Sequence, residues 1–151
     1  MSYVDQLQRI VNAYVDAKEP WPATTREIAG WAIQQGLWQA QPAAMVRQCA
    51  DELANAMREE YIVDAQGRTV RAKHVVRDHQ VALWADIRTA PPEHMQMAFQ
   101  QRRQQIVGDC RQLKIDVDSF NENYNTSEPI QMVFDFTQDL VELELAGQYD
   151  E

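Results

Sequence analysis

The chain has 151 residues, a net charge of −9 and 45% hydrophobic residues, enough apolar material for a core in one compact domain with or without an extension. No apolar run approaches the roughly 18 residues of a membrane-spanning helix, and acids stand early at the N-terminus, so we expect no membrane contact and no signal peptide. Cys49 and Cys110 share no motif, which favours two small buried side chains over a disulfide or a metal pair. These features predict a cytoplasmic protein.

The negative charge is concentrated in the second half of the chain. Residues 1–80 hold 9 Lys and Arg against 10 Asp and Glu, whereas residues 81–151 hold 5 against 13. A net charge of −9 argues against a protein coated in nucleic acid, because neutralisation of phosphates drives such binding. The first half is nearly neutral, however, and can still present a positive face.

The first third of the chain predicts three helices. Residues 2–18 place apolar side chains at helical spacing and are followed by a segment with two prolines, which ends the helix. Thr24 and Glu27 have the spacing of a capping box and predict the start of a second helix, for which Gly36 is a suitable end. Pro42 then stands near the first position of a third helix.

The third helix has one apolar and one polar side. Its predicted buried side consists of apolar residues at helical spacing: Met45, Val46, Cys49, Leu53, Ala56 and Met57. Its first turns present Arg47 and Gln48 on the outward side. Four acidic residues stand in its later turns, so only the first turns are electrostatically suited to an anionic partner.

A β-hairpin with a basic arm is predicted after the third helix. Residues 61–63 form a short apolar strand, residues 64–67 a turn in which Gly67 is free to take positive φ, and residues 68–77 the returning strand. The returning strand alternates, with Val70, Ala72, His74 and Val76 on one side and Thr69, Arg71, Lys73, Val75 and Arg77 on the other. Residues 65–77 contain four basic residues and no acid, which makes this the most basic window of the chain.

Residues 3–77 resemble a winged helix–turn–helix domain. The two-helix unit is REIAGWAIQQGLW followed by PAAMVRQCADELANAM, and the wing is YIVDAQGRTVRAKHVV. In that family the third helix enters the major groove of DNA and the wing contacts the backbone or the minor groove. The resemblance therefore implies that Arg47 and Gln48 face bases, and that Arg68, Arg71 and Lys73 face phosphates.

The second half predicts a connector and two helices. The connector, residues 79–90, has apolar side chains that suit a short helix against the core: Val81, Trp84 and Ile87. A helix about 50 Å long follows over residues 91–124. A polar turn then leads to a helix over residues 128–145, with Ser127 as its N-cap, so that the two helices form an antiparallel hairpin.

The long helix carries the apolar spacing of a coiled coil. The residues that step by seven, or alternately by four and three, are Phe99, Ile106, Cys110, Leu113, Val117, Phe120 and Tyr124. We expect dimerisation through Phe99, Ile106, Leu113, Val117 and Phe120, because a helix of this length outruns a small core. The alternative is that this seam packs against residues 128–145 of the same chain.

Residue patterns for catalysis or for metal binding are absent from the sequence. The three histidines have no ligand spacing with one another or with the cysteines, and there is no phosphate-binding glycine loop or nucleophile elbow. The acidic residues on the last two helices indicate a solvent-exposed face. A di-metal site between helices would use Glu-x-x-His pairs, and the sequence has none. We therefore expect no enzyme activity, no metal and no cofactor.

The predicted fold is mainly α with a small β-hairpin. It comprises a winged helix–turn–helix domain at residues 1–78, the connector at 79–90, and a long antiparallel helical hairpin at 91–151 that serves for dimerisation. The leading hypothesis is a dimeric transcriptional regulator that binds double-stranded DNA with its third helix and basic wing. Two alternatives stay open. In one, the basic arm serves only solubility. In the other, the winged helix is a protein–protein interaction module in a larger complex, does not bind DNA, and docks a protein partner through the acidic helical hairpin.

Overall fold

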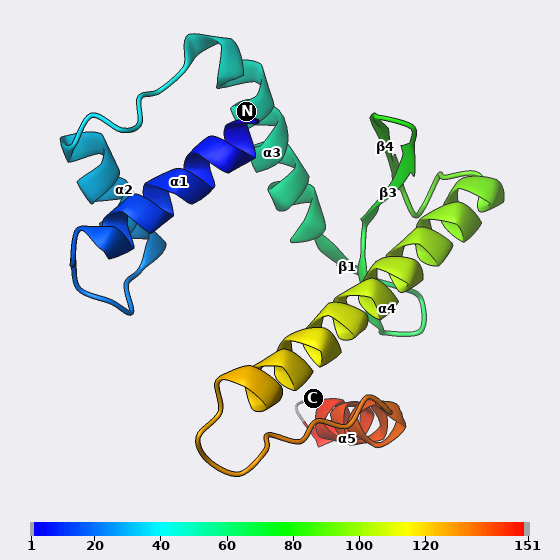
Figure 1. Cartoon of the computed structure of the whole chain (residues 1–151). Coiled ribbons are helices and arrows are strands. Elements are labelled where there is room, and N and C mark those ends of the chain that lie inside the picture. The colour runs from blue at the N-terminus through cyan, green and yellow to red at the C-terminus, as the bar shows by residue number, and fades with distance from the viewer. Residues whose placement is uncertain (1, 150–151) are drawn as a thin grey trace. The chain divides into compact units, whose positions relative to one another are not determined.

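The computed structural model describes residues 2–149, apart from the side chains of residues 43, 148 and 149. Its helices are α1 (Tyr3–Asp16), α2 (Thr25–Gln34), η1 (Pro42–Ala44), α3 (Met45–Arg58), α4 (Pro92–Asn123) and α5 (Thr137–Tyr149) (Figure 1). Its strands are β1 (Tyr61–Val63), β2 (Thr69–Arg71), β3 (Lys73–Asp78) and β4 (Val81–Asp86), in two antiparallel sheets of two strands each. The chain divides into two compact units, one up to Ala56 and one from Met57 onward.

The helix starts in the first unit are fixed by capping boxes. The Glu27 N–H donates to Thr24 Oγ1 over 3.1 Å, and the Thr24 N–H donates to Glu27 Oε2 over 3.4 Å, so two N–H groups without helical partners are satisfied. Ser2 and Asp5 repeat this arrangement at the start of α1. After α2, Gly36 takes a φ of 72°, a conformation that glycine adopts without steric cost. The predicted first two helices and the capping box at Thr24 are confirmed.

The first unit has a small core centred on Tyr14. This side chain is 3% exposed, its hydroxyl donates to the carbonyl of Pro20 over 2.7 Å, and its ring meets the Trp31 ring edge-on at 5.4 Å. Ala32 of α2 is buried at the same 3% exposure, so α1 and α2 pack closely there. An apolar groove of about 330 Å³ stays open on this pair of helices, lined by residues that include Leu7, Ile28 and Trp38.

The predicted buried side of α3 is wrong. None of the α3 residues is buried, and Met45, Val46 and Leu53 are 68%, 81% and 58% exposed. The helix itself forms as expected, with Pro42 in the single turn η1 directly before it. Amphipathic spacing identifies the apolar face of a helix but not the surface that covers it, which explains the error.

The second unit begins with the predicted hairpin. Strands β1 and β2 pair antiparallel, with Tyr61 opposite Arg71 and Val63 opposite Thr69. In the turn, Gly67 has a φ of 84°, and the Asp64 carboxylate accepts the backbone N–H groups of residues 66 and 68 at 3.0 and 2.8 Å. This Asx-type turn fixes the register of the hairpin, as the alternation of the sequence predicts.

The returning strand is split at Ala72, against the prediction of one strand over residues 68–77. The Ala72 N–H donates to the carbonyl of Glu60, and its own carbonyl accepts from the N–H of Ile87, so it joins the two sheets. Beyond this residue the chain pairs with β4, and Val75 lies opposite Trp84. The short helix predicted for the connector is therefore wrong: residues 81–86 are a strand, because β3 offers them a hydrogen-bonding edge that spacing alone does not reveal.

Replacing Ala72 with leucine is expected to lower the free energy of unfolding by about 1–3 kcal/mol, because the side chain is fully buried at 0% exposure and has no room for three more carbons. Chemical denaturation with circular dichroism measures the change. Thr69→Leu adds a similar apolar side chain at an exposed position of the neighbouring strand β2 and serves as the control. Equal stability of the two variants would contradict the role of Ala72 as the packed joint of the two sheets.

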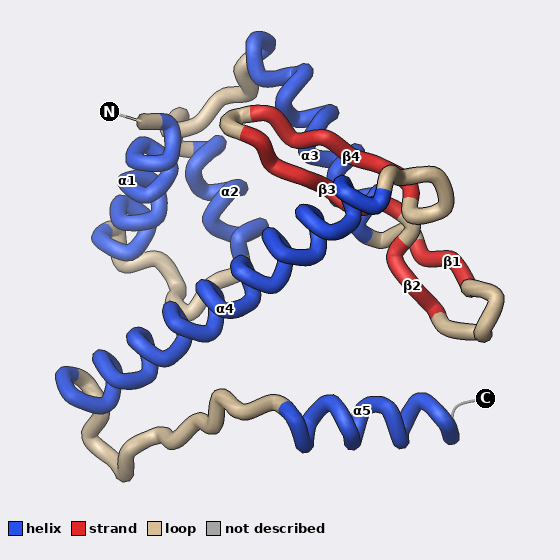
Figure 2. Tube along the Cα trace, turned by 90° about the vertical axis from the view of Figure 1, so that its right-hand side faces the viewer, coloured by secondary structure: helices blue, strands red, loops and turns tan. Residues whose placement is uncertain are grey.

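Helix α4 lies against β3, and both views show it running beside that strand (Figures 1 and 2). Residues of its first three turns make the contact, among them Gln101, which bonds to the backbone of Arg77. His94 Nε2 lies 3.0 Å from the carbonyl oxygen of His74, Ala98 is 4% exposed, and the Phe99 ring meets the His74 ring edge-on at 5.3 Å. The predicted long helix is confirmed, with ends that differ by one residue from those expected.

The helix predicted over residues 128–145 is wrong in its first half. Asn121 at the end of α4 holds Ile130 in a non-helical segment by donating to its carbonyl and accepting from its N–H, at 2.8 and 3.0 Å. Helix α5 starts only at Thr137, where the Asp135 carboxylate accepts from the Thr137 N–H and hydroxyl. These contacts to Thr137 lower the pKa of Asp135. The side-chain bonds of Asn121 take up the backbone groups that a helix at Ile130 would need, so the antiparallel helical hairpin of the prediction does not form over residues 128–136.

Candidate functional site

The five residues predicted to contact DNA are divided between the two units. Arg47 and Gln48 lie in the first unit on exposed turns of α3, and Gln48 Nε2 donates to Glu52 over 3.4 Å. Arg68, Arg71 and Lys73 lie in the second unit, on the hairpin and on β3.

Two of the three wing cations are already held by acids. Arg68 Nε lies 2.8 Å from Asp64 Oδ2 across the hairpin turn. Lys73 Nζ lies 3.0 Å from Glu60 Oε2 and 3.1 Å from Asp86 Oδ2, and these two partners raise its pKa. Of the three, only Arg71 makes no ion pair within residues 2–149. Contact of these residues with phosphate stays a prediction.

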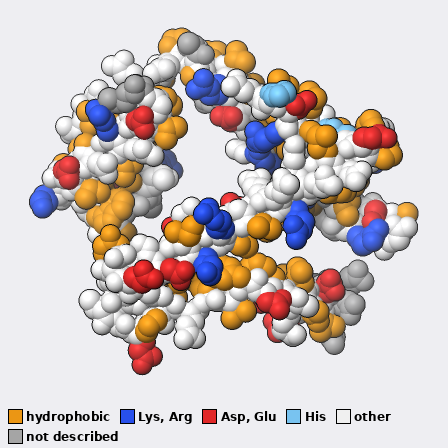
Figure 3. Space-filling model, turned by 45° about the vertical axis from the view of Figure 1, so that its right-hand side comes forward, with side chains coloured by type: hydrophobic (Ala, Val, Ile, Leu, Met, Phe, Trp, Pro, Cys, Tyr) orange, Lys and Arg blue, Asp and Glu red, His pale blue; other side chains and the backbone are white. Residues whose placement is uncertain are grey.

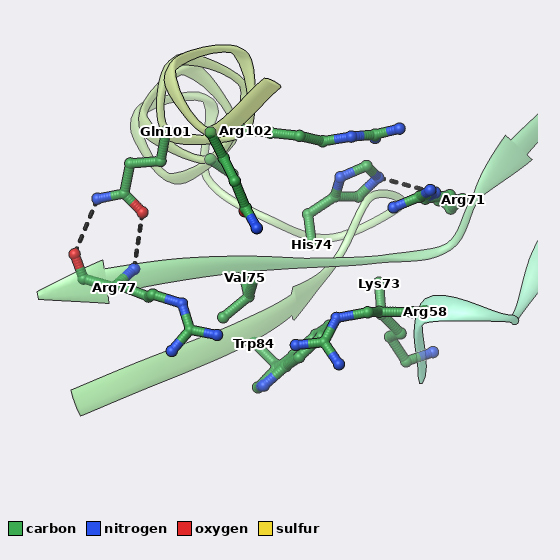
Figure 4. A pocket seen from close by; sticks show the side chains of 11 residues that line it. Arg58, Arg71, Lys73, His74, Val75, Arg77, Trp84, Gln101 and Arg102 are labelled. Atoms are coloured by element: carbon green, nitrogen blue, oxygen red, sulfur yellow. Dashed lines mark hydrogen bonds between the residues drawn. The ribbon is translucent and has the colours of Figure 1, made fainter. Parts of the chain in front are cut away.

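Arg71 instead joins a basic cleft along β3, beside α4, that the sequence did not predict; Arg102 lies on the α4 side of the strand, and Arg77 and Lys73 lie on the other side (Figure 4). The cleft measures about 530 Å³, and we call it the β3–α4 cleft (Figure 4). Its lining residues come from the end of α3, from β2, β3 and β4, and from α4: Arg58, Arg71, Lys73, His74, Val75, Arg77, Trp84, Ala98, Gln101, Arg102 and Gln105. Five of these are Lys or Arg, and no Asp or Glu of the described chain is among them.

Two side-chain contacts hold the arginines in place along the strand. The Gln101 amide of α4 accepts from the Arg77 N–H and donates to the Arg77 carbonyl, both over 2.8 Å (Figure 4). His74 Nε2 lies 2.8 Å from the carbonyl oxygen of Arg71, and the His74 side chain is only 7% exposed. The backbone beneath Arg71 and Arg77 is thus fixed by buried or bidentate contacts, while both guanidinium groups reach the cleft.

Arg71 and Arg102 of the cleft repel each other. The pKa of Arg102 is lowered, first by partial burial and then by the positive charge of Arg71. Within the described residues neither side chain, nor that of Arg77, has a salt bridge to an acid. Like charges held close together without a counter-charge favour the binding of an anion, which relieves the repulsion.

The wall of the cleft on the sheet side is aromatic and rigid. The Arg58 guanidinium lies over the Trp84 ring, 5.5 Å from its centroid, in cation–π geometry. Below it, Asp86 accepts from the Arg88 side chain and backbone and from Lys73, and these hydrogen bonds, with those of Arg88 the largest cause, hold the pKa of Asp86 well below its usual range. The Asp86 carboxylate is therefore ionised and committed to Arg88 and Lys73 around neutral pH.

Arg77 and Arg102 are the functional candidates that sequence reasoning missed. Arg77 stands in the basic window that the sequence identifies, and its alternation with Lys73 and Val75 was the available signal. Arg102 stands 25 residues later on a helix of mixed charge, and only the packing of α4 on β3 brings it to the cleft. Spacing within one element gives no sign of a contact between elements.

The predicted dimerisation residues lie open on α4. Phe99, Ile106, Leu113 and Phe120 are 49%, 52%, 44% and 43% exposed, and Val117 is half-buried. Hydrophobic side chains reach the surface at many places in the structure (Figure 3). Within the described chain, helix α5 leaves this seam largely uncovered, and its own Leu140 and Leu143 are 58% and 69% exposed.

Comparison with protein families, with curated proteins and with solved structures found no match for this chain. Among residues 2–149, no helix is both long and apolar enough to cross a membrane. In the same range, no three His, Cys, Asp or Glu side chains are grouped so that they could hold a metal ion. Among the described residues, the β3–α4 cleft gathers five cationic side chains and no acid, which suits it to an anionic ligand.

Proposed function

We propose that this protein binds double-stranded DNA through its phosphate backbone, with Arg71, Arg77 and Arg102 of the β3–α4 cleft as the phosphate ligands. The observation that carries the proposal is the cleft itself, which gathers five Lys and Arg residues and no acid in a chain of net charge −9. Arginine suits this task because its planar guanidinium donates two parallel hydrogen bonds to phosphate oxygens.

The rest of the proposal concerns how the protein recognises bases and how two copies of it bind DNA together. The order α1, α2, α3, β1, β2 is that of a winged helix–turn–helix, and we propose this fold for residues 3–77. Arg47 and Gln48 on the exposed first turns of α3 then contact base edges, and the cleft positions the duplex. The protein acts as a homodimeric transcriptional regulator. Its two copies bind two DNA half-sites that lie about one helical turn of the duplex apart.

The contribution of phosphate contacts to DNA affinity has a defined salt dependence. If three arginines each neutralise one phosphate, the slope of log affinity against log salt is about −2.7, and affinity falls about 40-fold between about 50 mM and about 200 mM salt. Fluorescence anisotropy with a labelled duplex of random sequence measures this slope without knowledge of the target site. Failure to bind at the lowest salt would sink the proposal.

A second candidate function is docking of a protein partner, without DNA. Two exposed leucines of α5 favour it, since Leu140 and Leu143 stand three residues apart on one side of the helix, are 58% and 69% exposed, and have acidic neighbours. An apolar face of this kind on an acidic helix fits a groove with a basic rim. Under this alternative, duplex binding is absent at all salt concentrations, and substitution of Leu143 by Asp disrupts the complex with the partner.

A further inference from the structure

We infer that two copies of the chain pair through α4 in antiparallel orientation. The inference deepens the homodimer of the proposed function by naming the helix, its direction and the charges that set it, and it does not depend on DNA binding. The starting point is the open apolar seam on a helix of 32 residues. From Phe99 to Phe120 this seam is about 32 Å long, which is enough for three heptads of helix–helix packing.

Most of the seam is free to meet a second helix because β3 packs mainly on a different face of α4. Phe99, whose ring meets that of His74, lies at the border of the two faces and is still 49% exposed. Residues 94, 98, 101 and 105 of α4 bond to β3, are buried beside it or line the cleft. At 100° per residue, these positions are centred roughly 110° around the helix from the seam. A second copy can therefore lie along the seam without displacing the sheet.

The position of Arg103 decides between the two directions of pairing. Counted in heptads, Arg103 falls within the seam itself, in line with Cys110 and Val117. In a parallel pair each such residue packs against its own equivalent, so the two Arg103 guanidinium groups would meet in the apolar interface. Two like charges at that depth oppose association, and within the described chain Arg103 has no salt bridge that could offset them.

An antiparallel pair removes this clash. The register that places Phe99 on Val117 of the second copy also places Ile106 on Cys110 and Arg103 on Leu113 of the second copy. The guanidinium of Arg103 then reaches Asp116 of the second copy, one turn further along. Asp116 is exposed and, within residues 2–149, accepts from Gln112 Nε2 over 2.8 Å, which leaves its carboxylate room for a second donor.

The balance of charges supports this register. By symmetry the contact between Arg103 and Asp116 occurs twice in the dimer. The one unfavourable pair is formed by Asp109 of one copy and Asp109 of the second copy, near the two-fold axis. A parallel pair offers two contacts between Asp109 and Lys114, but these lie at the exposed rim and contribute little against two arginines inside the seam. The antiparallel register is therefore the lower in free energy.

Charge reversal tests both the pairing and its direction. Sedimentation equilibrium is expected to show a dimer of the wild-type chain, and Arg103→Asp or Asp116→Arg alone should each weaken it about tenfold, because an attraction made twice becomes a repulsion. Combining Arg103→Asp with Asp116→Arg restores the attraction and should return the dissociation constant to within about threefold of the wild type. In a parallel dimer Asp116→Arg has no effect and the double variant shows no rescue, which would overturn the inference.

Cys110 gives an independent measure of direction. In a Cys49→Ala background, mild oxidation joins two copies readily through Cys110 if the helices are parallel, because the two thiols then face each other. The antiparallel register places Cys110 against Ile106, and the chain should remain without an intermolecular disulfide. A disulfide-linked dimer, or a wild-type chain that sediments as a monomer at all concentrations, would contradict the inference. Arg103 does not line the cleft, so its substitution leaves the proposed phosphate ligands in place. Dimerisation by sedimentation and duplex binding by anisotropy can therefore fail independently of each other.

Discussion

A chain carrying Arg71→Ala and Arg102→Ala is expected to bind duplex DNA about 100-fold more weakly than the wild type at the same salt concentration. Each substitution removes a charge-assisted contact to a phosphate oxygen, worth about 1.5–3 kcal/mol. Two such losses at the lower bound amount to about 3 kcal/mol, and every 1.4 kcal/mol is a factor of about ten. Fluorescence anisotropy at low salt measures the two dissociation constants.

The matched control removes the same charge elsewhere. Arg9→Ala with Arg68→Ala changes the net charge equally, but Arg9 is exposed on α1 and Arg68 is already paired with Asp64 at 2.8 Å. We expect this control to lose less than about threefold in affinity, since only long-range attraction changes. An equal loss in both double variants would mean that overall charge, and not the cleft, determines binding.

Ala98→Asp is expected to lower the free energy of unfolding of the second unit by about 3 kcal/mol or more. Ala98 is 4% exposed where α4 meets β3, so a carboxylate there is buried in a contact that has no room for a larger side chain, and the cleft arginines offset its desolvation only in part. Because this contact joins Arg102 to the arginines of the strand, the substitution should also abolish duplex binding. Chemical denaturation gives the first quantity and anisotropy the second.

Gln104→Asp is the control for Ala98→Asp. Gln104 is exposed on the same helix, so this substitution introduces the same carboxylate with the same helix propensity but without burial. Its expected cost is below about 1 kcal/mol. If Ala98→Asp proved as stable as Gln104→Asp, the packing of α4 on β3 would not be what holds the cleft together.

Structural features that depend on contacts between residues close together in the sequence could be predicted. The capping box at Thr24 and Glu27 and the turn at Asp64 to Gly67 each depend on groups two to four residues apart, and the structure has both. The alternation of β3 is equally local, and His74 and Val76 are buried as the pattern indicates. Local hydrogen bonding and side-chain direction carry enough information for these features.

Features that depend on a distant partner could not be predicted. Residues 81–86 have a spacing compatible with a helical turn, and they become a strand because the edge of β3 is available. The apolar face of α3 was correctly identified as a face, but nothing in its spacing says that Met45 and Val46 stay uncovered. At residue 130, one side chain from α4, that of Asn121, holds the chain out of the helix that the apolar spacing suggested.

The candidate site shows the same limit. Arg71 was predicted as a phosphate ligand from the basic window and does line the cleft, whereas Arg68 and Lys73 from the same window are held by acids. A count of charges along the sequence cannot separate these cases. The distinction arises from which carboxylates the hairpin and β4 bring within about 3 Å, which is the distance at which an ion pair satisfies the cation.

The salt slope of the double variant tests the central claim most directly. Arg71→Ala with Arg102→Ala removes two of three proposed phosphate contacts, so the slope of log affinity against log salt should fall in magnitude from about 2.7 to about 0.9. Anisotropy titrations of both proteins over the same salt series give the two slopes. A slope that stays at the wild-type value would show that the β3–α4 cleft does not hold the DNA backbone.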